Sequence, residues 1–230
     1  MGMRIPLAHV RTWQDHLSSR SDARTDRSAP LRKNAPVPTL RELRLTVDDA
    51  VTLSPLTAED APALVEAAAD PQLRRWLPLP SPYTLDTALD WCTSTTRSLR
   101  ESGQALIMAV RHDGRFGGSI EVKRIDWRAM TCELTYWTSA PLRGRSIMPT
   151  VVTRLSRWLI DDEQFQRVEL RVSPDNHASV RVAEKAGFTL EGTARNAGFT
   201  DAGRVDLAIY SLIPADRDSP IQDPVSGLLS

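Results

Sequence analysis

The residues best placed to do chemistry lie in one short loop that carries two arginines and a glycine. The loop reads Leu-Arg-Gly-Arg-Ser-Ile-Met over residues 142–148, between a predicted strand and a predicted helix. The first turn of a helix exposes unpaired N–H groups and the positive end of the helix dipole, which attract phosphate or pyrophosphate. Gly144 allows the backbone to approach such a group closely, and Arg143 and Arg145 add positive charge. A solvent-exposed turn without a ligand has this composition at least as often as an anion site does. The motifs around the loop are therefore needed to distinguish the two.

The elements on either side of this loop follow from hydrophobic periodicity. Residues 131–138 alternate between apolar and polar faces, which predicts a strand. After the loop, one helical stripe holds Val151, Val152, Leu155, Trp158 and Leu159. Residues 167–172 predict a short strand. Residues 173–176 predict a turn and a helix cap, followed by a short helix that ends at Lys185.

The remaining elements complete the pattern of a mixed domain. A first strand lies within residues 41–56, interrupted at Asp48-Asp49. Thr57 is expected to cap a helix, which ends at Asp70-Pro71. Residues 78–82 form a loop. Thr84 is expected to cap a second helix, which stops near Gly103. Asp113-Gly114 joins strands 105–111 and 116–125, and strands 188–195 and 204–213 form the last pair. The order β-α-α-β-β-β-α-β-α-β-β indicates an α/β or α+β domain around a mixed sheet.

Composition excludes several classes of protein. Among 230 residues, 29 Lys+Arg balance 29 Asp+Glu, so no net field draws the chain to nucleic acid or to an anionic membrane. Two cysteines (Cys92 and Cys132) and four scattered histidines fit neither a disulfide scaffold nor a metal site. The longest apolar stretch, residues 105–110, is far shorter than the roughly 20 residues of a membrane span. We expect a soluble, cytoplasmic protein without a metal.

Three regions differ in composition. Residues 1–38 carry seven Arg and Lys against three Asp and lack apolar periodicity in their second half, which predicts a flexible basic N-terminal extension. Residues 39–216 hold all of the predicted elements and form the expected domain. Residues 217–230 are rich in Asp, Pro and Ser, which predicts a disordered C-terminal tail.

Four motifs occur in order within residues 43–214. The first is Ile120-Glu121 with Ile125-Asp126, the second is Glu133-Leu134-Thr135-Tyr136-Trp137, and the third is the loop from Pro141 to Met148. The fourth, Asn-His-Ala-Ser-Val-Arg-Val-Ala-Glu-Lys-Ala-Gly-Phe over residues 176–188, is close to the signature N-x-x-S-x-x-V-A-E-K-x-G-F. In this order and spacing they resemble the GNAT superfamily of N-acetyltransferases, in particular its Rim-type branch, which acetylates protein N-termini and many small amines.

The resemblance implies both a fold and a site. The fold is of the α/β (α+β) class, with a mixed, mostly antiparallel, twisted sheet of about seven strands flanked by about four helices. The sheet splays where strands 131–138 and 167–172 diverge, and acetyl-CoA, the co-substrate, lies in that splay. The cofactor-binding residues that the resemblance implies are Tyr136, Trp137 and Thr138 for the pantetheine, Arg143, Gly144, Arg145, Ser146, Ile147 and Met148 for the pyrophosphate, and Asn176 and Ser179 near the thioester.

Two positions depart from the pattern of the superfamily. Ser146 stands where the loop of the superfamily usually has Gly, and it fits without strain if residue 146 has ordinary helical dihedral angles. Its side chain then either crowds the pyrophosphate or donates a hydrogen bond to it. Ala183 stands where many members have a Tyr that protonates the leaving thiolate, so Ser179 is the nearest candidate for the catalytic acid. Asn176 is compatible with both a helix cap and a ligand.

Attack on a thioester requires a neutral amine, so a carboxylate that takes a proton from the ammonium is expected. Glu133 is the first candidate for this base, and a solvated or salt-bridged strand residue is the alternative. Asp126 and Glu121 are weaker candidates.

The expected activity is therefore transfer of an acetyl group from acetyl-CoA to a primary amine by direct attack. The alternative is a catalytically impaired acetyltransferase fold that serves as a CoA-binding or accessory module. A protein N-terminus, an antibiotic amine and a polyamine all remain open as the acceptor. Nucleic acid and membrane are not expected as partners, and a homodimer is an expectation because dimers are common in folds of this kind.

Overall fold

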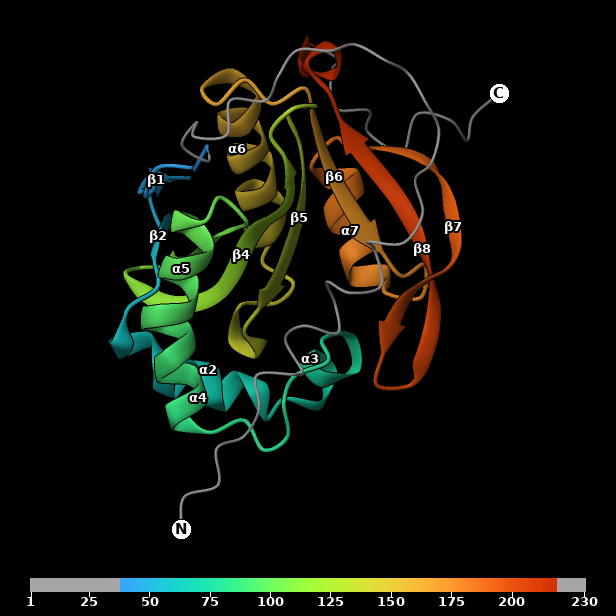
Figure 1. Cartoon of the computed structure of the whole chain (residues 1–230). Coiled ribbons are helices and arrows are strands. Elements are labelled where there is room, and N and C mark those ends of the chain that lie inside the picture. The colour runs from blue at the N-terminus through green and yellow to red at the C-terminus, as the bar shows by residue number, and fades with distance from the viewer. Residues whose placement is uncertain (1–37, 219–230) are drawn as a thin grey trace, which may run out of the picture. The chain divides into compact units, whose positions relative to one another are not determined.

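The computed structural model describes residues 38–218, and its eight strands form one sheet in the order β1-β2-β3-β4-β5-β6-β8-β7 (Figure 1). Neighbouring strands are antiparallel except β5 and β6, which are parallel. The predicted interruption near Asp48 separates β1 from β2, which adds one strand to the seven expected. The strands are β1 (Leu45–Thr46), β2 (Val51–Pro55), β3 (Leu106–His112), β4 (Arg115–Asp126), β5 (Thr131–Thr138), β6 (Arg167–Val172), β7 (Thr189–Thr200) and β8 (Gly203–Leu212).

Six α-helices accompany the sheet within the described residues, against about four expected. They are α2 (Ala61–Ala68), α3 (Pro71–Trp76), α4 (Leu85–Asp90), α5 (Thr96–Glu101), α6 (Ile147–Asp161) and α7 (His177–Lys185). A π-helical turn, Trp91–Thr95, joins α4 to α5, so these two form the single helix that was expected after Thr84. The cap at Thr84 is confirmed, because its side chain accepts a hydrogen bond from the Thr87 N–H.

Helix α3 was not predicted from the sequence, because Asp70-Pro71 was interpreted only as the end of the preceding helix. Pro71 instead occupies the first position of α3, where a residue without an N–H is favoured. The Asp70 side chain caps this helix by accepting a hydrogen bond from the Gln72 N–H at 2.9 Å. The dipeptide therefore both ends α2 and begins α3.

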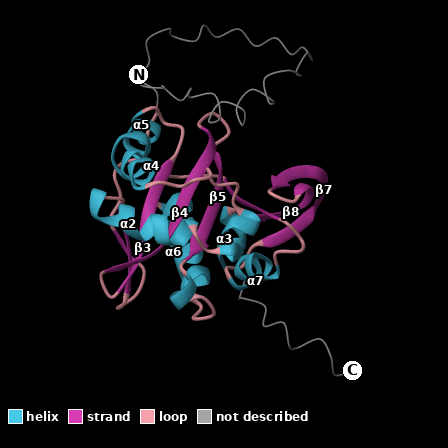
Figure 2. Cartoon of the chain, turned by 90° about the horizontal axis from the view of Figure 1, so that it is seen from below, coloured by secondary structure: helices cyan, strands magenta, loops and turns pink. Residues whose placement is uncertain are grey.

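Helices cover both faces of the sheet, with α4 and α5 on one side and α6 and α7 on the other (Figure 2). Alternation along the strands produces two cores. Ile120, Val122 and Leu134 pack into the first core with side chains of α6. Ile107 and Ala109 pack into the second core with side chains of α2 and α4. The predicted alternation of β5 is confirmed, with Cys132, Leu134 and Tyr136 on the side of the first core.

The sheet opens between β5 and β6. Thr131–Leu134 pairs in parallel with Arg167–Leu170, and the ladder ends there. β5 continues to Thr138 beside β4 alone, whereas β6 continues to Val172 beside β8. The two strands thus diverge at Thr135, and the predicted splay is confirmed.

A buried ion pair fastens the start of α2 to the sheet. Asp60 is only 3% exposed, and both of its carboxylate oxygens accept hydrogen bonds from the guanidinium of Arg111 on β3, at 3.0 and 2.9 Å. Arg111 also donates through Nε to Ser54 Oγ at 2.7 Å. The same carboxylate also accepts a hydrogen bond, at 2.9 Å, from the backbone N–H of Thr57, the residue that caps this helix start.

The predicted extension (1–38) and tail (217–230) fall almost wholly on residues outside the described range, so both stay predictions. No helix among residues 38–218 is long and apolar enough to cross a membrane. Nor does this part of the chain bring together three or more side chains that could hold a metal ion.

Candidate functional site

The loop before α6 presents a row of backbone donors. The N–H groups of residues 144–148 have no hydrogen-bond partner among residues 38–218, and Pro149 follows them without an N–H. Gly144 (φ +76°) and Ser146 (φ +59°) both have left-handed backbones. Successive N–H groups in such turns point into one concavity that suits an anion. The side chains of Ile147 and Met148 are buried in the first core, so these two residues offer only their N–H groups.

Ser146 does not have the ordinary helical dihedral angles under which it would fit without strain. Its φ of 59° and ψ of 14° are left-handed, a conformation in which glycine is favoured because it lacks Cβ. This geometry explains physically why Gly suits the position. The Ser146 side chain is exposed and makes no hydrogen bond within the described residues.

We predict that Ser146→Gly stabilises the protein. Relief of the left-handed Ser backbone is worth about 1 kcal/mol, partly offset by the greater flexibility of Gly in the unfolded chain. The melting temperature should therefore rise by roughly 1–4 °C. Calorimetry of acetyl-CoA binding distinguishes the two roles of the side chain: tighter binding indicates that Ser146 crowds the pyrophosphate, and weaker binding indicates that its hydroxyl is a ligand. An unchanged melting temperature would contradict the strain argument.

The two arginines of the loop differ in their surroundings. The Arg143 guanidinium pairs with Asp70, donates to Gln72 Oε1 at 2.8 Å, and donates to the Thr138 carbonyl at 3.1 Å. Burial opposes ionisation of Asp70, but the hydrogen bond from Arg143 and those from backbone N–H groups lower the pKa of Asp70 below its ordinary value. Arg145 is exposed and has no ion-pair partner in the described part of the chain. The sequence did not predict that α3 would touch this loop, since α3 itself was missed.

The predicted pantetheine strand lies at the open edge of the sheet. Tyr136, Trp137 and Thr138 face β4 on one side and the splay on the other. β4 approaches this edge closely at Gly118, where a Cβ would lie 2.3 Å from the Trp137 carbonyl oxygen. The side chains alternate, because Trp137 packs on Phe116 with ring centroids 5.7 Å apart on the second-core side.

Tyr136 reaches across the splay to α7. Its hydroxyl donates to the Ser179 carbonyl at 3.3 Å, and burial raises its pKa. The Asn176 side-chain carbonyl accepts the Ser179 N–H at 3.2 Å, which confirms the helix-cap role of Asn176. The Asn176 amide nitrogen and the Ser179 hydroxyl make no hydrogen bond within residues 38–218, so both are available to a ligand. Their roles toward acetyl-CoA stay predictions.

The candidate carboxylates occupy different environments. Glu133 is 8% exposed and lies 3.5 Å from Lys123 Nζ, 3.5 Å from Arg124 Nε and 3.8 Å from Arg171 Nε. It therefore has the salt-bridged surroundings that were the alternative to a catalytic role, and its assignment as the base stays a prediction.

Asp126 belongs to a turn. Its carboxylate accepts the backbone N–H groups of Ala129 and Arg128, both at 2.9 Å, and these bonds lower its pKa. Glu121 differs from both, since burial raises its pKa and it makes no hydrogen bond or ion pair within the described range. The absence of a partner for Glu121 could not be predicted from the sequence, because it depends on which face of the sheet the helices cover.

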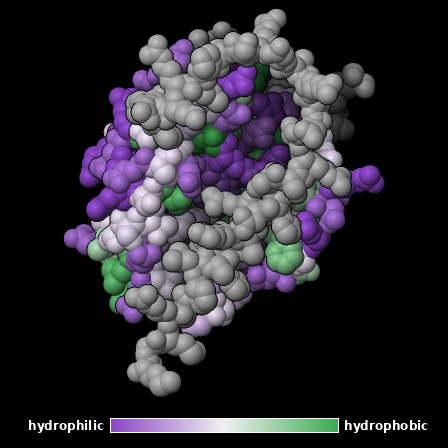
Figure 3. All heavy atoms as spheres, viewed as in Figure 1, coloured by the Kyte–Doolittle hydropathy of each residue, from purple (hydrophilic) through white to green (hydrophobic). Residues whose placement is uncertain are grey.

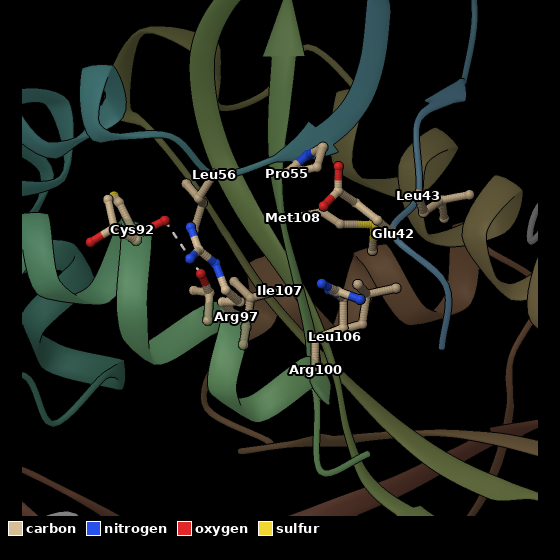
Figure 4. A pocket seen from close by; sticks show the side chains of 12 residues that line it. Glu42, Leu43, Pro55, Leu56, Cys92, Arg97, Arg100, Leu106, Ile107 and Met108 are labelled. Carbon is tan, nitrogen blue, oxygen red and sulfur yellow. Dashed lines mark hydrogen bonds between the residues drawn. The ribbon is translucent and has the colours of Figure 1, made fainter. Parts of the chain in front are cut away.

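The surface over β6 is hydrophilic (Figure 3). Charged side chains of Arg167, Glu169 and Arg171 point to this face, because Val168, Leu170 and Val172 alternate into the first core. A separate cavity of about 110 Å³ lies between β2, β3 and the segment α4–α5 (Figure 4). It is lined by residues such as Cys92, Arg97 and Arg100 and by none of the predicted site residues, so we assign the site to the splay.

Comparison with known proteins identifies the family. The acetyltransferase (GNAT) domain matches residues 50–189, more than half of the chain. The Bacillus subtilis (strain 168) protein named "Putative ribosomal N-acetyltransferase YdaF" is 25% identical over 170 residues, 73% of this chain and 93% of that protein. The ribosomal-protein-serine acetyltransferase of Escherichia coli (strain K12) is 26% identical over 115 residues, 50% of this chain and 64% of that protein.

Solved structures share the fold. RimL, a ribosomal L7/L12 alpha-N-protein acetyltransferase in complex with coenzyme A, superposes with a TM-score of 0.69 at 21% identity, covering 74% of this chain and 98% of that one. The microcin C7 self-immunity acetyltransferase MccE, in complex with acetyl-CoA and AMP, superposes with a TM-score of 0.67 at 22% identity, covering 73% and 94%. The family match and the named relatives favour an active enzyme over an impaired CoA-binding module. The chain belongs to the GNAT family of acetyltransferases and is an acetyl-CoA-dependent N-acetyltransferase.

Proposed function

We propose that this enzyme acetylates the α-amino group at the N-terminus of a protein, with ribosomal proteins as the acceptor class. Two relatives are named for ribosomal acceptors, one of them for a serine. A ribosomal acceptor would place the enzyme in the cytoplasm. A homodimer remains a prediction, which sedimentation of the purified chain tests.

The observation that carries the proposal is the splay with its adjoining row of donors. The open edge of β5 from Thr135 to Thr138 offers backbone groups to an extended pantetheine. The N–H groups of residues 144–148 would hold the pyrophosphate without any change of backbone. Asn176 and Ser179 would meet the other side of the cofactor from the start of α7. Ser179 would be the nearest donor for the leaving thiolate.

The test measures acetyl-CoA-dependent thiol release with a panel of acceptors. The panel contains peptides that begin with serine or alanine, the same peptides with a blocked N-terminus, a polyamine and an aminoglycoside. Release with the unblocked peptides alone, together with a mass gain of one acetyl group at residue 1 of the peptide, supports the proposal. Release only with the polyamine or the aminoglycoside would move the acceptor class to small amines. No release with any of them would contradict the proposed function.

A further inference from the structure

The face of the sheet that carries the second core also carries a band of charged side chains. Glu121 and Lys123 lie on β4, Glu133 on β5, and Glu169 and Arg171 on β6. They share one face because Lys123 pairs in register with Glu133, which pairs in turn with Glu169. A carboxylate on this face is near the amine acceptor only if it also lies near the point where β5 and β6 begin to diverge.

Glu121 satisfies that condition. It pairs in register with Ile107 on β3 and with Thr135 on β5. Thr135 is the first residue of β5 beyond the parallel ladder, so it marks the point where the splay opens. Directly paired residues have Cα atoms roughly 4.5–5.5 Å apart in an antiparallel sheet. Glu121 therefore lies one strand away from the innermost end of the proposed cofactor cleft, on the face of Ile107.

The other carboxylates near this face are already engaged. Three cations surround Glu133. Glu169 pairs with Arg167 at 2.7 Å and with Arg171 at 3.5 Å. Asp60 forms the bidentate pair with Arg111. Of the carboxylates named on this face, only Glu121 has no ion-pair partner among residues 38–218, so its carboxylate is the one open to an ammonium group.

We propose, building on the proposed function, that Glu121 is the general base that deprotonates the acceptor amine. Its carboxylate takes a proton from the ammonium, directly or through one water. The neutral nitrogen then attacks the thioester carbonyl carbon, the new C–N bond forms and the C–S bond breaks. The sulfur leaves as a thiolate and is protonated by the Ser179 hydroxyl, which in turn takes the second proton of the amine, and the products are the amide and the free thiol. Glu121 returns its proton to solvent.

The electrostatic surroundings of Glu121 suit this role. Burial raises its pKa, Lys123 on its own strand opposes that rise, and Glu133 on β5 adds to it. On this face β3 contributes the apolar Ile107 and Ala109 and, farther along the strand, Arg111, whose charge is paired with Asp60. The titratable members of the second core are Cys92 and Tyr83. A carboxylate whose pKa is raised toward the working pH accepts a proton more readily than an ordinary one.

The test compares Glu121→Gln with the matched variant Glu169→Gln on the same face, using the serine peptide and acetyl-CoA. Glu121→Gln should lower kcat at least tenfold, since a positioned base contributes roughly 100- to 10,000-fold, while the Kd for acetyl-CoA stays within twofold. The deficit should shrink as pH rises, because more of the amine then arrives neutral. Glu121→Asp should restore part of the rate. Glu169→Gln should lower kcat less than threefold and lower the melting temperature, because it removes the charge that Arg167 and Arg171 share.

Stability provides a second readout that does not depend on turnover. A carboxyl whose pKa is raised in the folded state stabilises the fold at low pH, and that contribution is lost as pH rises through the raised pKa. Glu121→Gln should therefore melt at a higher temperature than the wild type at pH 8. A kcat for Glu121→Gln within threefold of wild type, or a melting temperature that falls, would overturn the assignment. A wild-type chain that acetylates none of the acceptors would instead refute the proposed function.

Discussion

Asp60→Asn should destabilise the domain by about 3–5 kcal/mol, the usual consequence of removing one partner of a buried ion pair. The change preserves the size of the side chain but leaves the Arg111 guanidinium, which is 19% exposed, without its counter-charge. It also weakens the acceptor of the Thr57 N–H at the start of α2. Because a domain of this size is stable by only about 5–15 kcal/mol, the shift should be evident in urea unfolding.

A double-mutant cycle isolates the pair. Arg111→Met alone should destabilise strongly as well, because it leaves Asp60 buried without a cation, whereas the double variant should lose much less than the sum of the two. Glu59→Gln is the matched control, since Glu59 is an exposed neighbour whose change should cost less than about 0.5 kcal/mol. Additive losses in the cycle would show that the two side chains do not depend on one another.

The ion pair between Asp60 and Arg111 matters to function because it positions helix α2. Asp60 fixes the start of α2, and α2 contributes Ala61 and Leu64 to the second core beside Ile107. Ile107 is the register partner of Glu121. The pair thus holds in place the helical layer that packs on Ile107, the neighbour of the proposed base on β3.

Much of the fold could be predicted from the sequence because its signals are local. The alternation over residues 131–138 and 167–172 gave β5 and β6 with their observed bounds. Thr84 and Asp113-Gly114 marked a helix start and a hairpin, as the structure confirms. Helix α3 was missed because a proline that ends one helix also suits the first position of the next.

The site was less predictable, since its properties depend on tertiary contacts. The left-handed backbone of Ser146 arises from the path of the loop between β5 and α6, which no local pattern specifies. The absence of an ion pair at Glu121 depends on the nearby cations, which pair with Glu133 and Glu169 instead. The contact between Arg143 and Asp70 joins residues 73 positions apart in the sequence.

The contact between Arg143 and Asp70 leads to a second prediction with a large effect, on the binding of acetyl-CoA. Arg143→Ala should weaken acetyl-CoA binding by roughly 5- to 30-fold, the equivalent of losing one charged phosphate contact worth about 1–2 kcal/mol. The loss should diminish as salt concentration rises, because screening weakens the contact in the wild type. Arg115→Ala is the control, an exposed arginine in the β3–β4 hairpin whose loss should leave the Kd unchanged.

Asp70→Asn tests how Arg143 acts. Asn retains the cap of α3 but removes the charge that competes with the pyrophosphate for Arg143. Acetyl-CoA should therefore bind about two- to fivefold more tightly, in line with the modest worth of a partly exposed ion pair. Because the pKa of Asp70 lies below its ordinary value, the pair is lost only as pH falls through that lowered pKa, and the gain should be constant between pH 6 and 8. Calorimetry that finds the same Kd for wild type, Arg143→Ala and Asp70→Asn would show that Arg143 serves α3 alone and that the backbone of residues 144–148 binds the pyrophosphate without it.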